Sequence, residues 1–302
     1  MLWILCGKQI FSSVREGGRL MWKEEYRLGV DTIDRQHQQL FEMVDGLLAV
    51  IDDCEHADYK KKCADAVSFL YDYTVKHFQF EEGYQESIGY KDIEAHKLQH
   101  KRFIITVGNF AKKMIDSEYD MKVVKAFSGS LVAWLNYHVA DTDQKIVGKN
   151  PSRGSESLLT CLDSFSDSAA NVIMTMLGLS RGEITRTMPP KMNFKGDITF
   201  EIGLTGDVAG KAVFAYSADF ARAIIKSLVA RDIDELDEIA RSAMAETSNI
   251  IGGKSTVMMS GDGRTCDITP PTLTANLREG WGMEGFHLHT GKGDMQVLLA
   301  VE

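Results

Sequence analysis

Seven side chains in the first half of the chain have the types and the spacing of metal ligands. They are His37, His77, Glu81, His96, His100, His138 and Asp143. Glu81 follows His77 by four residues, and His100 follows His96 by four. Residues four apart on an α-helix lie on one face, so each pair can bind one metal centre.

The last pair is spaced differently, because Asp143 follows His138 by five residues. Five residues correspond to about 140° around an ideal α-helix, an angle that suits two bridged ions better than one. Seven protein ligands also exceed the four of a tetrahedral zinc site. Two six-coordinate ions that share both carboxylates would accommodate all seven, so the sequence predicts a dinuclear centre.

Four amphipathic helices are expected to position these ligands. Apolar residues recur at intervals of three and four in residues 33–53, 62–89, 93–115 and 121–147. In each segment a histidine interrupts the apolar stripe. Without partners, polar groups buried in such a seam would cost roughly 1–3 kcal/mol each, which argues against a core that holds no metal. The pattern predicts an all-α, up-and-down four-helix bundle around the centre.

The order His, His-x3-Glu, His-x3-His and His-x4-Asp resembles the ligand pattern of hemerythrin over residues 21–148. The resemblance implies two non-haem iron ions that are bridged by Glu81, Asp143 and an oxo or hydroxo group. Dioxygen would bind at the one position left open, and nitric oxide is a further candidate ligand. One ion would be held by His96, His100 and His138, and the other by His37 and His77.

Apolar neighbours of these histidines are candidates for walls that would exclude water from the centre. They are Phe78, Leu98, Phe103 and Trp134.

A change of pattern divides the chain into domains. Residues 1–20 lack helical or strand periodicity and are expected to be a disordered extension or a miscalled start. The bundle domain spans residues 21–148, and the Gly-, Pro- and Ser-rich residues 149–156 are expected to form a linker. Residues 157–302 alternate strand-like hairpins with long helices, which predicts an α+β domain with an antiparallel sheet.

A polar stripe runs along one long helix of this second domain, which is predicted to end near Ile251 before a separate segment at residues 255–260. Ser242, Glu246 and Asn249 follow one another at spacings of four and three beside the apolar face. Such a stripe is common on a solvent-exposed surface helix. A carboxylate and an amide on a rigid helix could instead enter another protein's site, where the amide orients water for attack on a phosphoryl group.

The pattern Ser242-x3-Glu246-x2-Asn249, followed by Pro270 and Pro271, resembles the CheX branch of the CheC/CheX/FliY response-regulator phosphatases. The resemblance implies that Asn249 positions the water that attacks a phosphoaspartate of a CheY-like response regulator. Glu246 would pair with a lysine of that partner, which would carry its own Mg²⁺. The resemblance also implies a homodimer formed through the CheX-like domain.

An earlier segment, residues 166–173, has Asn171 but places Ser168 where the glutamate would be needed. One active helix per chain is therefore expected.

The composition of the 302-residue chain excludes several other classes of protein. Its formal net charge of −9 argues against nonspecific binding to nucleic acid or to anionic membranes. No apolar run approaches the roughly 18 residues of a membrane span. The five cysteines are scattered and include no CxxC pair, which favours thiols in a reducing cytoplasm.

Together these features predict an oxygen- or redox-responsive signalling protein that dephosphorylates a response regulator. Two alternatives remain open at this point. The second domain could bind a response regulator without catalysis, as an adaptor. The bundle could instead be an oxygen store or a di-iron peroxidase that the second domain only localises.

Overall fold

The computed structural model describes residues 22–52, 58–149, 161–188, 194, 196–229, 235–260, 265–274 and 284–301. The predicted extension over residues 1–20 lies outside the described residues, as does the predicted linker over residues 149–156 apart from Lys149. Contacts between Cα atoms divide the chain into two compact units near residue 151. None of the described helices combines the length and the apolar character that crossing a membrane requires.

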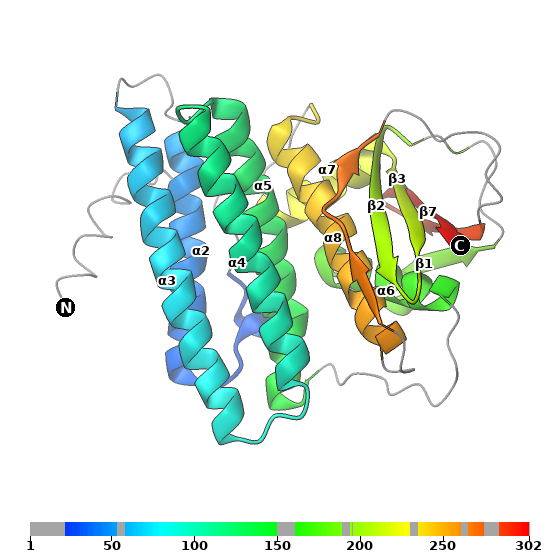
Figure 1. The fold of residues 1–302 in the computed structure, drawn as a ribbon, viewed down its shortest axis with the longest axis horizontal. Helices are drawn as coiled ribbons and strands as arrows, with labels where there is room; N and C mark the ends of the chain where they lie inside the picture. Colours follow the sequence, from blue (N-terminus) through cyan, green and yellow to red (C-terminus); the bar gives the residue numbers. More distant parts are fainter. Residues whose placement is uncertain are drawn as a thin grey trace. The chain divides into compact units, whose positions relative to one another are not determined.

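The first unit is built from four long helices, labelled α2 to α5 in Figure 1. They are α2 (Asp31–Asp52), α3 (Tyr59–Ser87), α4 (Ile93–Asp116) and α5 (Met121–Tyr137), and a short 3-10 helix, η1 (Glu24–Tyr26), precedes them. Each helix contacts the next, and α5 contacts α2, so that the four close into a bundle. Short connections between consecutive helices give an up-and-down topology. The predicted bundle is confirmed.

The apolar stripe predicted for α2 is buried in the bundle core. Ile33, Phe41, Val44 and Leu47 are each at most 1% exposed. The buried carboxylate of Asp34 fixes the start of this helix, because its two oxygens accept hydrogen bonds from the backbone N–H groups of residues 28 and 29. The helix that carries His37 is therefore held firmly at its first turn.

The fourth helix departs from the prediction of one continuous α-helix over residues 121–147. After α5 the chain forms a π-helical turn, η2 (His138–Thr142), and then a 3-10 helix, η3 (Asp143–Val147). The backbone N–H of Asp143 donates to the carbonyl of His138, five residues earlier. Residues five apart are thereby brought onto one face, which a regular α-helix does not allow.

The second unit contains an antiparallel sheet, and seven strands lie among the described residues. They are β1 (Ile184–Thr187), β2 (Ile198–Gly206), β3 (Gly210–Tyr216), β4 (Cys266–Ile268), β5 (Thr272–Leu273), β6 (Glu284–Thr290) and β7 (Gly293–Val301). Their order is β1-β6-β7-β3-β2-β4, and β5 also pairs with β2. All pairs are antiparallel, and the hairpins β2–β3 and β6–β7 lie where the sequence predicts them. The predicted α+β class is confirmed.

Helices α6 (Cys161–Leu177), α7 (Ala218–Val229) and α8 (Glu238–Ser260) accompany the sheet. Helices α6 and α8 pack against each other, and both contact strands of the sheet, as Figure 1 shows. Alternate residues of β2 form part of the core beneath them: Ile198, Phe200, Ile202 and Leu204 are at most 5% exposed. This packing gives α8 a rigid support.

The prediction that this long helix ends near Ile251 is wrong, because α8 continues through Gly252 and Gly253 to Ser260. A Cβ atom on Gly252 would lie 2.5 Å from Cδ1 of Ile202, so the glycine allows close helix–sheet packing there and does not act as a stop signal. Strand β1 was not predicted from the sequence.

Candidate functional site

The bundle brings all seven predicted metal-binding residues together in its interior. Each of them is at most 2% exposed. They come from every helix of the bundle: His37 from α2, His77 and Glu81 from α3, His96 and His100 from α4, and His138 and Asp143 from the turns after α5.

Three of the histidines form one group. Nε2 of His100 lies 3.2 Å from Nε2 of His96 and 3.0 Å from Nε2 of His138. One N–H can lie between two such nitrogens, but three nitrogens this close cannot all satisfy one another. A single metal ion can accept all three lone pairs. With Glu81, their ligand atoms lie within 4.8 Å of one another.

The other two histidines form a second group with the same glutamate. His37 and His77 pack edge to face, with ring centroids 4.8 Å apart. Ligand atoms of these two rings and of Glu81 again lie within 4.8 Å of one another. Glu81 thus belongs to both groups.

Each of the two carboxylates has one oxygen closest to each histidine group, and Oε2 of Glu81 also lies 3.7 Å from Nε2 of His100. Glu81 places Oε1 3.1 Å from Nε2 of His96 and Oε2 3.4 Å from Nε2 of His77. Asp143 places Oδ1 3.0 Å from Nε2 of His138 and Oδ2 3.2 Å from Nε2 of His37. Two carboxylates placed in this way can bridge two adjacent ions.

The donor set fits a metal centre better than it fits a hydrogen-bonded core. Several of its buried atoms make no hydrogen bond of acceptable geometry, even where a polar atom is near: Nδ1 and Nε2 of His37, Oε2 of Glu81, Nδ1 of His96, Nδ1 of His138, and both oxygens of Asp143. Left so, each buried group costs roughly 1–3 kcal/mol. Imidazole nitrogens and carboxylate oxygens are suitable ligands for iron, which would remove much of this cost.

The surroundings of His77, His100 and Asp143 favour the forms of these side chains that bind metal. Burial is the largest influence on His77 and His100, and it holds the pKa of both rings well below the usual histidine value. Burial alone would raise the pKa of Asp143, but the His138 and His37 rings beside it hold that pKa well below its usual range. The rings of His77 and His100 therefore keep their lone pairs, and the aspartate remains an anion. For His37 and His96, burial lowers the pKa, but the neighbouring carboxylates outweigh it and the pKa is raised.

Aromatic side chains cover the three-histidine group. The ring of Phe78 stacks on His100 with centroids 3.7 Å apart, and Trp134 stacks on His138 at 4.2 Å. Phe103 in turn stacks on Trp134. Leu98, a further candidate for this wall, is 40% exposed.

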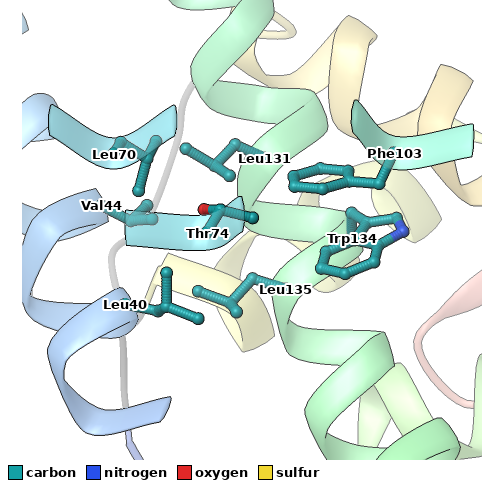
Figure 2. Close-up of a pocket in the computed structure, with 8 residues that line it drawn as sticks. All are labelled: Leu40, Val44, Leu70, Thr74, Phe103, Leu131, Trp134 and Leu135. Atoms are coloured by element: carbon teal, nitrogen blue, oxygen red, sulfur yellow. The ribbon is translucent and has the colours of Figure 1, made fainter. Parts of the chain in front are cut away.

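A small apolar cavity lies one helical turn from the histidines. Figure 2 shows its lining: Leu40, Val44, Leu70, Thr74, Phe103, Leu131, Trp134 and Leu135. Three or four residues, about one turn, separate Leu40 from His37 and Trp134 from His138. Its volume of about 10 Å³ is enough for one water-sized molecule, and its apolar walls favour a small apolar ligand.

Three polar residues around the centre were not predicted from the sequence. Gln36 places Oε1 3.1 Å from Nδ1 of His77, and Glu82 places Oε1 2.8 Å from Nδ1 of His100. The buried amide of Gln85 donates to Oε1 of Glu81 at 3.0 Å. Only Gln85, one helical turn after Glu81, has a spacing that could have indicated its contact.

The predicted catalytic residues lie on the middle of α8. Nδ2 of Asn249 donates to Oε1 of Glu246 at 3.3 Å, a contact between residues three apart on one helical face. Ser242 is half-buried, one turn earlier on that face. Glu246 is 6% exposed, and Asn249 is half-buried.

The corresponding asparagine of α6 has a different environment. Oδ1 of Asn171 accepts a hydrogen bond from Nζ of Lys254 at 2.6 Å. Ser168, which replaces the glutamate of the motif, is fully buried and donates to the sulfur of Met258. Helix α6 thus has a buried serine where α8 has Glu246.

Comparison with known proteins identifies the first unit. Residues 28–149 match the Hemerythrin HHE cation binding domain family. The chain is 35% identical to a bacteriohemerythrin of Clostridium acetobutylicum over 127 residues, which are 42% of this chain and 98% of that protein.

The second unit matches a different family, because residues 198–279 match the chemotaxis phosphatase CheX family. The chain is 32% identical to the CheY-P phosphatase CheX of Thermotoga maritima over 75 residues, 24% of this chain, and spans 48% of that protein. The fold is also similar to a chain in the crystal structure of the CheX–CheY–BeF3–Mg²⁺ complex from Borrelia burgdorferi, with 22% sequence identity and a TM-score of 0.42. The match covers 47% of this chain and 98% of that one. The chain therefore belongs to the hemerythrin family through its first domain, and residues 198–279 of its second domain match the CheX family.

Proposed function

We propose that this protein is an oxygen- or redox-responsive signalling protein that binds dioxygen at a di-iron site and dephosphorylates a CheY-like response regulator. The di-iron site, the first half of this proposal, is supported by the placement of the two carboxylates. Glu81 and Asp143 each have one oxygen closest to the three-histidine group and one closest to the two-histidine group. A site for a single ion would not need this symmetry.

In this proposal, three histidines hold one iron ion and two hold the other, with both carboxylates shared. The first set is His96, His100 and His138, and the second is His37 and His77. Iron held there would supply reversible dioxygen binding and a change of redox state, and nitric oxide is a second candidate ligand. Phe78 and Trp134 stack on the rings of the first set and exclude water from them.

The second half of the proposal rests on the CheX domain. The CheX of Thermotoga maritima is a CheY-P phosphatase. On this chain, the amide of Asn249 would orient the water that attacks the phosphoaspartate, and Glu246 would pair with a lysine of the response regulator. The Mg²⁺ ion would arrive with that partner. The proposal includes a homodimer formed through this domain. A measurement of the protein's molecular mass in solution would test it.

Coupling between the domains requires the iron state to change the relative free energies of an active and an inactive phosphatase. The metal centre is suited to start such a change, because its ligand Asp143 is the first residue of η3. This 3-10 helix is the last element of the bundle before residues 149–156.

The test measures phosphate release from a phosphorylated CheY-like receiver by the full chain. The chain is prepared with reduced iron without oxygen, with reduced iron under oxygen, and with oxidised iron. Different rates between these preparations are expected. The Asn249→Ala variant gives the background rate of the receiver alone.

The outcomes separate the two halves of the proposal. Equal rates in the three preparations, all above the Asn249→Ala background, would retain the phosphatase and overturn the sensor. Rates that equal the background in every preparation would overturn the phosphatase and favour an adaptor. Spectra recorded with oxygen and with nitric oxide would distinguish the two ligands.

A further inference from the structure

The five histidines of the centre differ in what their outer nitrogens contact. Among the described residues, Nδ1 has no hydrogen-bond partner in three of them: His37, His96 and His138. Nδ1 of His77 faces the neutral amide oxygen of Gln36 at 3.1 Å. Nδ1 of His100 faces a carboxylate, with Oε1 of Glu82 at 2.8 Å. The five histidines therefore differ in the group that their outer nitrogen, Nδ1, contacts.

The geometry around His100 fixes which nitrogen carries the proton. Its Nε2 points at Nε2 of His96 and of His138, where a lone pair is needed for a metal. Its Nδ1 must then carry the hydrogen, and the Glu82 carboxylate accepts it. The Phe78 ring lies nearly parallel to the imidazole, with an interplanar angle of 5°. The ring of His100 is thus held at its edge by a charge and at its face by an aromatic ring.

The position of Glu82 keeps the free-energy cost of its contact with His100 low. The Glu82 side chain is 26% exposed, whereas that of His100 is 3% exposed. The carboxylate therefore stays in partial contact with water while it bonds a buried ring, and avoids the cost of full burial. Glu82 follows Glu81 directly on α3, so one helical turn supplies both a direct ligand and a support for another ligand.

We propose that Glu82 is a positioning residue that fixes the Nδ1–H form and the orientation of His100, and so strengthens the hold of the three-histidine group on its ion. Carboxylates that accept from a metal-binding histidine raise the basicity of the ring, and their loss typically weakens metal binding about 10- to 100-fold. The inference rests on the proposed metal centre and is independent of the proposed signalling.

The first test uses the metal-free full chain and ¹⁵N NMR of the histidine rings. His100 is expected in the Nδ1–H form in the wild-type chain and in a mixture of forms in Glu82→Ala. The Glu86→Ala variant is the control, because Glu86 lies one turn further along α3 and pairs only at the surface with Lys97 among the contacts described here. A change in Glu86→Ala as large as that in Glu82→Ala would overturn the proposal.

The second test uses the iron-loaded chain and measures the rate of iron transfer to a chelator, the absorption spectrum and the midpoint potential. Glu82→Ala is expected to release iron about tenfold faster or more. Glu82→Gln keeps an acceptor oxygen without the charge, so its release rate should lie near the wild-type rate while its midpoint potential rises. Glu86→Ala should match the wild type in all three.

Two results of the second test would overturn the proposal. One is a Glu82→Ala chain that releases iron as slowly as Glu86→Ala does. The other is a Glu82→Gln chain as impaired as Glu82→Ala in both release and spectrum, because an acceptor at this position would then have no effect. A chain that binds no iron in any variant would overturn the proposed centre, and the NMR comparison of the metal-free chains would still test the contact with His100.

Discussion

Nε2 of His138 lies 3.0 Å from Oδ1 of Asp143, although the two residues are five positions apart. On an ideal α-helix their side chains would diverge by about 140°. The π-helical turn removes this divergence, and the buried carboxylate of Asp141 anchors it. Oδ2 of Asp141 accepts from the hydroxyl of Tyr137 at 2.9 Å and from Nζ of Lys145 at 2.8 Å, before and after the turn.

Replacing Asp141 with alanine should therefore destabilise the bundle and weaken iron binding. The loss leaves the buried Tyr137 hydroxyl without this acceptor, which is expected to lower the free energy of unfolding by about 1–3 kcal/mol. Urea unfolding of the metal-free chain and iron release to a chelator measure the two effects. Asp141→Asn, which keeps an oxygen for Tyr137, should fall between wild type and Asp141→Ala. If Asp141→Ala has the unfolding free energy and the iron-release rate of the wild type, the turn needs no such anchor.

Metal removal should destabilise the first domain and leave the second unchanged. Ligand binding to the folded state alone stabilises it by about 2.7 kcal/mol at a free concentration of one hundred times Kd. The unpartnered atoms of His37 and Asp143 give iron this role in the bundle. In calorimetry, a chelator should lower one melting transition and leave the other in place.

Glu81→Ala is the matched control for this experiment, because Glu81 belongs to both histidine groups. Its melting should not respond to iron or to the chelator. A wild-type chain whose transitions are both indifferent to the chelator would contradict the proposed centre.

The ligands could be predicted from sequence because regular helices convert spacing into position. His77 with Glu81 and His96 with His100 lie on regular α-helices, where residues four apart share a face. The π-turn at His138 could not be predicted, because no residue type marks a backbone hydrogen bond that spans five residues. The contact between Glu82 and His100 joins two helices, and spacing within one helix does not reveal it.

The same limit explains the error in α8. Two consecutive glycines normally indicate the end of a helix. Here Gly252 fits against Ile202 of the sheet, a contact between elements that are distant in sequence. Beyond it the Ser255 hydroxyl donates to the carbonyl of Ile251, and the Ser260 hydroxyl donates to that of Thr256, in the way serine does inside helices. Tertiary packing therefore overrode the local signal.

Asn249→Ala should abolish most of the proposed phosphatase activity without unfolding the domain. Loss of one polar group that acts on the reacting centre typically costs about 100-fold or more in kcat. Asn171→Ala is the matched control, because Asn171 is the same residue type on α6 but contacts Lys254. Phosphate release from a phosphorylated receiver measures both variants, and circular dichroism checks their folding. Equal activity of the two variants would assign no special role to α8.

The hydroxyl of Tyr216 ties the sheet to α8, because it lies 2.8 Å from Oγ of Ser248, the residue before Asn249. Both side chains are fully buried. Tyr216→Phe should lower the free energy of unfolding of the second domain by about 1 kcal/mol at pH 7, the net contribution of one hydrogen bond.

The stabilising effect of Tyr216 should decrease above pH 10. Burial raises the pKa of the Tyr216 phenol above its usual value of 10. Above pH 10 the phenol ionises in the unfolded chain and stays neutral in the folded one, so the unfolded state binds fewer protons. Stability then falls as pH rises, by up to about 1.4 kcal/mol per pH unit from this group. The contribution is complete below pH 10 and is lost as the pH rises towards the folded pKa.

Urea unfolding of wild type and Tyr216→Phe at pH 7, 10 and 11 tests this expectation. Other buried tyrosines contribute equally to both chains, so the difference between the two isolates Tyr216. Wild type should be the more stable chain at pH 7, and its advantage should shrink or reverse by pH 11, because phenylalanine has no proton to lose. A difference that stays constant over this range would mean that the Tyr216 phenol ionises alike in the folded and unfolded chains.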